Sequence, residues 1–310
     1  MVSGKYVEDL VEGSLTHSYY ESGFNHEVIF LGDCEMYANF SPMVIYEESG
    51  IKSFVRANSS QLVHQSYYLL KETLKYEIPE VVVFNINSLR YSKKEKVNEA
   101  YNRLMIDQMK WSKEKIDLIN VSMSEKESFL SYVFPILRYH SRIDELTFED
   151  VKYLFKNETK SFNGFIVNKG IVKYENLPSI RPLNNYSFPS ENMEYMDKIV
   201  ELCKNNGINL VLVKSPSLYP YWYDEYDRLI QDYALKNNLD YYNLLDVVDE
   251  VGIDYDVDTY DGGLHLNLSG ATKVSRYFSD ILKNNYELDL SRNSEFDSLL
   301  LEYNNYIGLK

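Results

Sequence analysis

A cysteine follows the first strongly apolar run of the sequence, at a position suited to nucleophilic chemistry. Cys34 comes directly after Gly32 and Asp33, and the run Glu27–Leu31 before them is typical of a buried strand. A thiol at the start of the helix after such a strand lies near backbone N–H groups that lower its pKa and stabilise an oxyanion. The alternative is a small buried side chain, because free cysteines are often found in protein cores.

A histidine near the other end of the chain is a candidate base for that thiol. His265 lies in the segment 261–267, whose sequence is Asp-Gly-Gly-Leu-His-Leu-Asn, just before the last predicted helix. A histidine at such a place can act as a general base, and Asp261 can orient its ring. The two glycines between them allow the loop to fold closely around a site. Asp258 is a second candidate for the acid.

Short apolar runs alternate with helical patterns over much of the chain. The sequence predicts strands over 27–31, 51–55, 80–85, 209–214 and 239–242, and helices over 42–48, 61–76, 192–206, 225–237 and 269–284. Strands separated by helices indicate right-handed crossovers and a parallel sheet covered on both faces. Ligands bind beyond the carboxyl ends of the strands in such sheets, where Cys34 and His265 would both lie.

The chain length of 310 residues favours one domain with additions. We expect a single domain over 1–310, with a helical insertion over 88–191 and a C-terminal appendage over 286–310. Helices are predicted within the insertion over 95–111, 125–139 and 147–155, and we expect the insertion to lie over the carboxyl edge of the sheet and to wall the cleft.

Composition narrows the classes of partner. The formal net charge is −15, from 47 acidic and 32 basic side chains, and such a chain repels phosphate backbones, so we expect no nucleic-acid partner. Two cysteines make no disulfide framework, and no apolar run is long enough for a transmembrane helix. Neither Cys-x-x-Cys nor His-x-x-x-His spacing occurs, so we expect no metal and no cofactor.

The segments around Cys34 and His265 resemble two conserved blocks of the SGNH (GDSL-type) hydrolase family. In that family the first strand ends in Gly-Asp-Ser, whose serine is the nucleophile, and a late Asp-x-x-His segment supplies the other two triad members. Here cysteine stands in the serine position, and Asp261 precedes His265 by four residues instead of three. The stretches 32–37 and 263–271 look most like a clostridial, cell-surface branch, which resembles proteins encoded beside membrane-bound O-acyltransferases.

The resemblance implies a fold and a site. The fold is α/β and flavodoxin-like, with a five-stranded parallel sheet of order 2-1-3-4-5 and flanking helices. Cys34 would be the nucleophile, His265 the base and Asp261 the acid. The oxyanion hole would combine the backbone N–H groups of Cys34 and Ser60 with the side chain of Asn87. Where the family has a glycine after the second strand, this sequence has none.

The implied function is acyl transfer or ester hydrolysis, of the O-acetyltransferase or esterase type, on a cell-surface glycopolymer. Glu35, Tyr37 and Lys214 are the candidate substrate-binding residues. The partners would be the glycopolymer or an acyl donor, and a membrane-bound O-acyltransferase. We expect the protein to act at the extracellular face of a bacterial membrane, with a native N-terminal anchor outside this sequence. A cytoplasmic thioesterase is a further alternative. The alternative is a non-catalytic SGNH-fold protein that binds the polymer or the acyltransferase.

Overall fold

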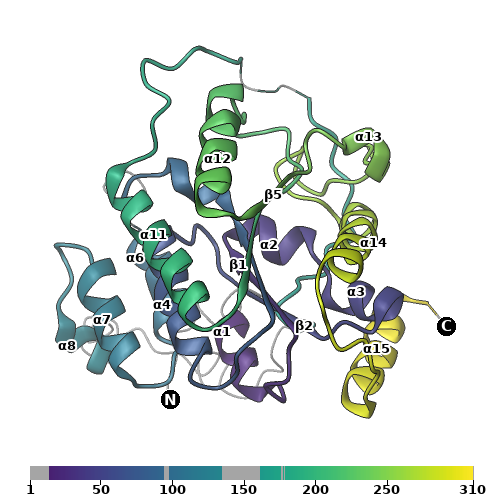
Figure 1. Cartoon of the computed structure of the whole chain (residues 1–310), viewed down its shortest axis with the longest axis horizontal. Coiled ribbons are helices and arrows are strands. Elements are labelled where there is room, and N and C mark those ends of the chain that lie inside the picture. Colours follow the sequence, from purple (N-terminus) through teal and green to yellow (C-terminus); the bar gives the residue numbers. More distant parts are fainter. Residues whose placement is uncertain (1–13, 94–97, 135–160, 176, 178, 310) are drawn as a thin grey trace, which may run out of the picture.

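A parallel five-stranded sheet forms the centre of the protein (Figure 1). The structure is a computed structural model that describes residues 14–93, 98–134, 161–175, 177 and 179–309. The strands are β1 (Val28–Gly32), β2 (Ser53–Ala57), β3 (Val81–Asn85), β4 (Asn209–Lys214) and β5 (Asp240–Asn243). Their order is β2-β1-β3-β4-β5, and every neighbouring pair is parallel, which confirms the predicted order.

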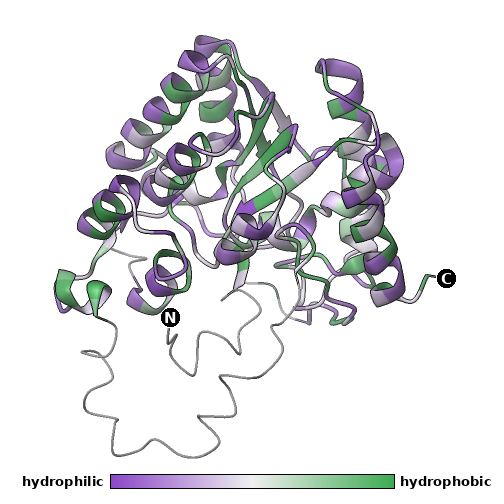
Figure 2. Ribbon diagram, turned by 90° about the horizontal axis from the view of Figure 1, so that it is seen from below, coloured by the Kyte–Doolittle hydropathy of each residue, from purple (hydrophilic) through white to green (hydrophobic). Residues whose placement is uncertain are grey.

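Burial explains the apolar composition of the central strands. Every residue of β1, β2 and β3 is buried, because helices cover both faces of the sheet. Alternate side chains of β1 enter different cores: Ile29 and Leu31 enter one, and Val28 and Phe30 enter the other. Figure 2 shows the hydrophobic strands at the centre, with helices whose outer surfaces are hydrophilic.

The helices that flank the sheet form two layers (Figure 1). One core receives side chains from α4 (Val63–Thr73), α11 (Ser190–Asn205) and α12 (Asp224–Asn237). The other receives them from α2 (Cys34–Asn39), α3 (Pro42–Ser49) and α14 (Leu268–Asn285). The predicted helices of the sheet region are therefore confirmed. Shorter elements are α1 (Leu15–Ser18), η2 (Tyr19–Glu21) and α13 (Val248–Val251).

The described helices of the insertion lie on the side of the sheet that α4 covers. After η3 (Ile86–Arg90) come α6 (Glu99–Ile106), α7 (Lys113–Ser122) and α8 (Phe129–Val133). α7 packs on α4, and the apolar faces of α6 and α7 extend the core on that side of the sheet. An amphipathic helix is stabilised wherever its apolar face is buried, and sequence does not say against which neighbour. The helix predicted over 147–155 lies outside the described residues.

Among the described residues of the insertion, the irregular segment 161–175 reaches the carboxyl edge. The Val172 N–H donates to the Thr259 carbonyl at 3.0 Å, and the Gly262 N–H donates to the Val172 carbonyl at 3.1 Å. At its start the Val55 N–H donates to the Asn163 carbonyl at 2.9 Å, which covers the open side of the edge strand β2. This stretch therefore borders the loop that carries His265.

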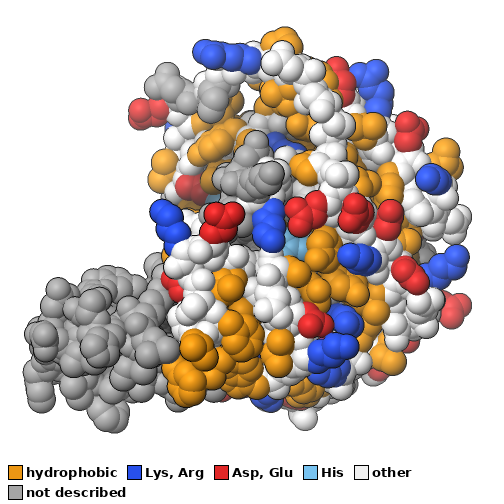
Figure 3. Space-filling model, turned by 90° about the vertical axis from the view of Figure 1, so that its left-hand side faces the viewer, with side chains coloured by type: hydrophobic (Ala, Val, Ile, Leu, Met, Phe, Trp, Pro, Cys, Tyr) orange, Lys and Arg blue, Asp and Glu red, His pale blue; other side chains and the backbone are white. Residues whose placement is uncertain are grey.

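The C-terminal appendage contains one helix, α15 (Ser294–Ile307), which packs on α3. Phe296, Leu300 and Tyr303 bury their side chains there. No helix of the described residues is long and apolar enough to cross a bilayer. Figure 3 shows the face that carries α6, α7 and α11, where acidic and basic side chains of the described residues are interspersed.

Candidate active site

The turn after β1 places Cys34 at the first position of α2. Asp33 is the N-cap of this helix, and its Oδ1 accepts a hydrogen bond from the Glu35 N–H at 3.2 Å. Gly32 allows the turn to pass close to β3, since a Cβ there would lie 2.8 Å from Cβ of Asn85 and 2.9 Å from Cγ of Met36. Close packing against β3 therefore requires glycine before the Asp-Cys pair.

His265 is held by Asp261 through both its ring and its backbone. Its Nδ1 lies 2.6 Å from Oδ2 of Asp261, and its backbone N–H donates to Oδ1 of the same carboxylate at 2.8 Å. The glycines between them have left-handed φ values, 78° at Gly262 and 99° at Gly263. This turn absorbs the additional residue, so the longer spacing still brings the acid against the imidazole.

The backup acid, Asp258, does not face His265. Its carboxylate is fully buried, where Oδ2 accepts from Nζ of Lys273 at 2.7 Å and from the Asp254 N–H at 2.8 Å. Burial raises the pKa of Asp258. The hydrogen bonds from Lys273 and Asp254 outweigh this effect and hold the pKa below its ordinary value. Asp258 therefore anchors the loop before α14, and Asp261 is the acid that the geometry favours.

Cys34 and His265 lie close enough at the carboxyl edge to shift each other's pKa. Burial lowers the pKa of His265, but Asp261 and the neighbouring thiol raise it to about 10. Burial raises the pKa of Cys34 and the Asp33 carboxylate raises it further, while His265 lowers it. Nε2 of His265 is buried and has no hydrogen-bond partner among the described residues.

The Tyr260 ring lies against the imidazole of His265. The two ring centroids are 5.7 Å apart and the planes differ by 10°, which is a stacked arrangement. Stacking limits rotation of the imidazole about the Cβ–Cγ bond. The π face of Tyr260 also favours the cationic form of the ring. Together with Asp261, this ring restricts the orientation of the imidazole.

Two of the expected oxyanion groups lie at the ends of strands next to β1. Nδ2 of Asn87 donates to Oδ2 of Asp33 at 2.8 Å, which places this amide beside the residue that precedes Cys34. Ser60 follows β2, and its φ of 54° is the left-handed conformation that a glycine adopts without strain. The backbone at Ser60 thus has a glycine-like conformation although the side chain is serine.

Glu35 and Lys214 are fully buried, which corrects the expectation that they bind substrate. Nζ of Lys214 lies 3.0 Å from both carboxylate oxygens of Glu35. Ser217 and Asn85 donate to the same carboxylate at 3.1 and 3.0 Å. Burial lowers the pKa of Lys214 more than Glu35 raises it. The pair lies in the interior behind residues 32–34, the turn that carries Cys34 and is called the nucleophile turn below. Neither side chain can reach a substrate there.

Tyr37 also has little surface for a substrate. Only 4% of it is exposed, and its hydroxyl lies 2.9 Å from Oγ of Ser59. Its ring belongs to the core on the α14 side of the sheet. Tyr37 therefore supports the turn that contains Ser60, a different role from the expected contact with substrate.

Sequence analysis missed Asn39, the last residue of α2. Its Oδ1 accepts from the Leu266 N–H at 2.9 Å, and its Nδ2 donates to Oγ of Ser215 at 2.7 Å. One fully buried amide thus ties the nucleophile helix to the histidine loop and to the end of β4. The only sequence signal is an asparagine at the end of the short helix that begins with Cys34.

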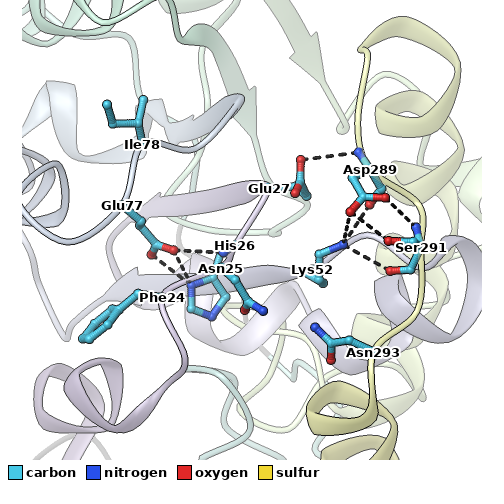
Figure 4. Close-up of a pocket in the computed structure, with 10 residues that line it drawn as sticks. All are labelled: Phe24, Asn25, His26, Glu27, Lys52, Glu77, Ile78, Asp289, Ser291 and Asn293. Atoms are coloured by element: carbon cyan, nitrogen blue, oxygen red, sulfur yellow. Dashed lines mark hydrogen bonds and ion pairs between the residues drawn. The ribbon is translucent and has the colours of Figure 1, made fainter.

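The groove shown in Figure 4 lies at the opposite edge of the sheet from Cys34. Its volume is about 510 Å³, and it is lined by residues at the amino ends of β1 and β2 and by the segment before α15. Two of its side-chain pairs are in contact, His26 with Glu77 at 2.9 Å and Lys52 with Asp289 at 3.2 Å. In the described part of the chain, no three His, Cys, Asp or Glu side chains are grouped to hold a metal.

Comparisons with known proteins give low similarity. No family model and no curated protein matches the sequence. One similar structure is a protein assigned to the lipolytic G-D-S-L family from Desulfitobacterium hafniense, with 13% identity, TM-score 0.42, and coverage of 83% of this chain and 100% of that one. Another is a GDSL-like lipase from Bacteroides thetaiotaomicron, with 12% identity, TM-score 0.38, and coverage of 88% and 98%. At these TM-scores the likeness carries no argument, and the fold rests on the sheet order described above.

Proposed function

We propose that this protein is an SGNH-type enzyme that transfers or hydrolyses acyl esters through Cys34. The observation that carries the proposal is His265, held by Asp261 at 2.6 Å, with a buried and unpartnered Nε2 beside the thiol. A nucleophile, a base beside it and an acid that orients the base form the arrangement that acyl transfer requires. It lies at the carboxyl edge, where α/β sheets bind their ligands.

Each step has a residue to perform it. His265 takes the thiol proton at Nε2 while Sγ of Cys34 attacks the ester carbonyl carbon, and the carbonyl π electrons move to the oxygen. The intermediate collapses by breaking the carbon–oxygen bond to the alcohol, which takes the proton from Nε2 and leaves a thioester. A second hydroxyl or water then gives its proton to His265 and attacks the thioester carbonyl carbon. The carbon–sulfur bond breaks, and Sγ of Cys34 takes the proton back from Nε2.

The oxyanion that forms in both steps needs donors on one side of Cys34. The N–H groups of Cys34 and Ser60 and the second Nδ2 hydrogen of Asn87 are the proposed donors. Asn87 uses only one of its two Nδ2 hydrogens on Asp33. The left-handed conformation of Ser60 supports a backbone N–H turned toward the nucleophile turn.

The substrate we propose is an O-acyl ester of a surface glycopolymer, acted on at the extracellular face of a bacterial membrane. A membrane-bound O-acyltransferase would be the partner that supplies or consumes the acyl group. The net charge of −15 favours a neutral or zwitterionic polymer over an anionic one, because like charges repel. A thioester transfers readily to hydroxyl groups, which suits a transferase.

One observation favours the second candidate, a protein without catalysis that binds the polymer or the acyltransferase. Burial and the Asp33 carboxylate raise the pKa of Cys34, which reduces the fraction of thiolate. The serine of the resembled family needs no such ionisation before it attacks. A thiol that stays protonated and unreactive at neutral pH would indicate this second function.

Turnover of p-nitrophenyl acetate distinguishes the two candidates. We expect steady-state hydrolysis by the wild type, with loss of turnover in Cys34→Ala and retention of folding. Cys203→Ala is the matched control, because Cys203 is buried in the opposite core. Equal turnover in the wild type and Cys34→Ala would overturn the proposal.

A further inference from the structure

The side chain of Arg90 lies against the amide of Asn87, at the end of η3. Nη2 of Arg90 donates to Oδ1 of Asn87, and Nη1 donates to the carbonyls of Pro220 and Tyr221 at 3.2 and 3.1 Å. The guanidinium thus joins the turn after β3 to the loop between β4 and α12. Its Cζ lies 4.9 Å from the centre of the Tyr91 ring, so one planar face is covered.

Asn87 lies between a cation and a carboxylate. Arg90 donates to Oδ1 on one side, and Asp33 accepts from Nδ2 on the other at 2.8 Å. Only one of the two amide orientations satisfies both partners, because a flipped amide would turn NH₂ toward the guanidinium and oxygen toward the carboxylate. The pair of charges therefore fixes which end of Asn87 faces the nucleophile turn.

Charge also strengthens the amide as a donor. A cation bound at the oxygen of an amide withdraws electron density from its nitrogen, and chains of hydrogen bonds polarise one another in a low-dielectric interior. Asn87 is 4% exposed, so water competes little for these bonds. The Nδ2 hydrogen that does not bind Asp33 is the one this polarisation would present to an oxyanion.

We propose that Arg90 is a positioning residue of the oxyanion site, which orients and polarises Asn87 for the reaction at Cys34. This inference rests on the proposed function. Arg90 does not touch the acyl group and acts through Asn87. A lysine cannot replace it fully, because one ammonium lacks the planar fork that reaches Asn87 and the Pro220 carbonyl together.

Two rates on the same thiol separate this role from a structural one. Acylation by p-nitrophenyl acetate forms an oxyanion, whereas alkylation by iodoacetamide does not. We expect Arg90→Met to slow acylation between about 10- and 100-fold, less than the loss of a whole donor, and to leave alkylation within about twofold. The acylation rate of Arg90→Lys should lie between those of Arg90→Met and the wild type. Arg228→Met is the control, because that guanidinium is 68% exposed on α12.

A double-mutant cycle with Asn87→Ala completes the test. In that background Arg90→Met should change acylation by less than about twofold, since the group through which Arg90 acts is gone. Independent, multiplicative effects of the two substitutions would overturn the inference, as would an equal loss of acylation and alkylation in Arg90→Met. Failure of the proposed function looks different: the wild type itself would show no acylation at Cys34.

A second measurement does not depend on activity. The side-chain amide resonances of Asn87 are assigned in a ¹H–¹⁵N spectrum by their absence in Asn87→Ala. Loss of the cation at Oδ1 should move these resonances in Arg90→Met, and Arg228→Met should leave them in place. Unchanged Asn87 resonances in Arg90→Met would contradict the proposed polarisation even if the protein proved inactive.

Discussion

Oδ1 of Asp261 accepts the backbone N–H of His265 at 2.8 Å, while Oδ2 of the same carboxylate holds the ring Nδ1 at 2.6 Å. One side chain thus fixes both the loop and the imidazole that the loop carries. The carboxylate is only partly buried, with 27% of its side chain exposed, whereas the imidazole is 9% exposed. The acid therefore connects a solvent-accessible loop to a buried base, and several predictions depend on this arrangement.

Asp261→Asn should remove most of the activity while the fold is retained. An amide at this position cannot stabilise the imidazolium, and the corresponding change in a serine triad lowers kcat by about 10⁴-fold. We expect a loss of at least about 100-fold, measured as hydrolysis of p-nitrophenyl acetate. Asp256→Asn is the control, because Asp256 forms an exposed pair with Lys173. A wild-type rate in Asp261→Asn would exclude Asp261 as the acid.

Gly263→Ala should disturb the histidine loop. A Cβ at this position would lie 2.6 Å from Cδ1 of Leu218, and its φ of 99° strains any other residue. We expect a loss of roughly 1–3 kcal/mol in the free energy of unfolding, together with reduced activity. Gly252→Ala has a similar positive φ of 76° but meets nothing within 4 Å, so it should cost about 1 kcal/mol and retain activity. Equal activities of the two variants would contradict the role of the turn.

The pH dependence of Cys34 alkylation should shift in opposite directions in two variants. The imidazolium of His265 stabilises the thiolate and lowers its pKa, so His265→Ala should move the midpoint to higher pH. The Asp33 carboxylate raises the pKa of the thiol, so Asp33→Asn should move the midpoint to lower pH, and asparagine can still cap α2. Iodoacetamide rates over a pH series test both, and a common direction would refute the assignment of these charges.

Lys214→Met should destabilise the fold without contacting substrate. It leaves the Glu35 carboxylate without its cation in the interior, and breaking a buried pair costs about 3–5 kcal/mol. The double variant Glu35→Gln with Lys214→Met should recover part of that loss, because no charge remains buried. Urea denaturation measures both. A Lys214→Met variant as stable as the wild type would show that the pair does not stabilise the fold.

The centre of the sheet could be predicted from sequence because β1, β3 and β4 are mostly apolar. The residues from Val81 to Asn85 read Val-Val-Val-Phe-Asn, and such a run between turn signals fits only a strand buried on both faces. The helix predicted over 269–284 is α14, whose N-cap is Asn267; the Asn267 side chain accepts from the Ser269 and Gly270 N–H groups. A cap depends on local backbone geometry, so its position is harder to predict than the helix itself.

The surroundings of the candidate site were harder to predict. A charged residue next to a nucleophile is typical of a binding surface, yet Glu35 is fully buried because Lys214, 179 positions away, neutralises it. Arg90 and Asn39 act through contacts with Asn87 and Leu266 that no local pattern encodes. Sequence therefore indicated which residues could react, and the fold was needed to show which side chains hold them.

Intact mass spectrometry after incubation with p-nitrophenyl acetate tests the central claim most directly. The proposal predicts a mass gain of one acetyl group in the wild type that maps to Cys34 and is lost in Cys34→Ala. In His265→Ala the gain should appear much more slowly, because no base takes the thiol proton. A Cys34 that stays unmodified, or that reacts at the rate of a free thiol regardless of His265, would contradict the catalytic account.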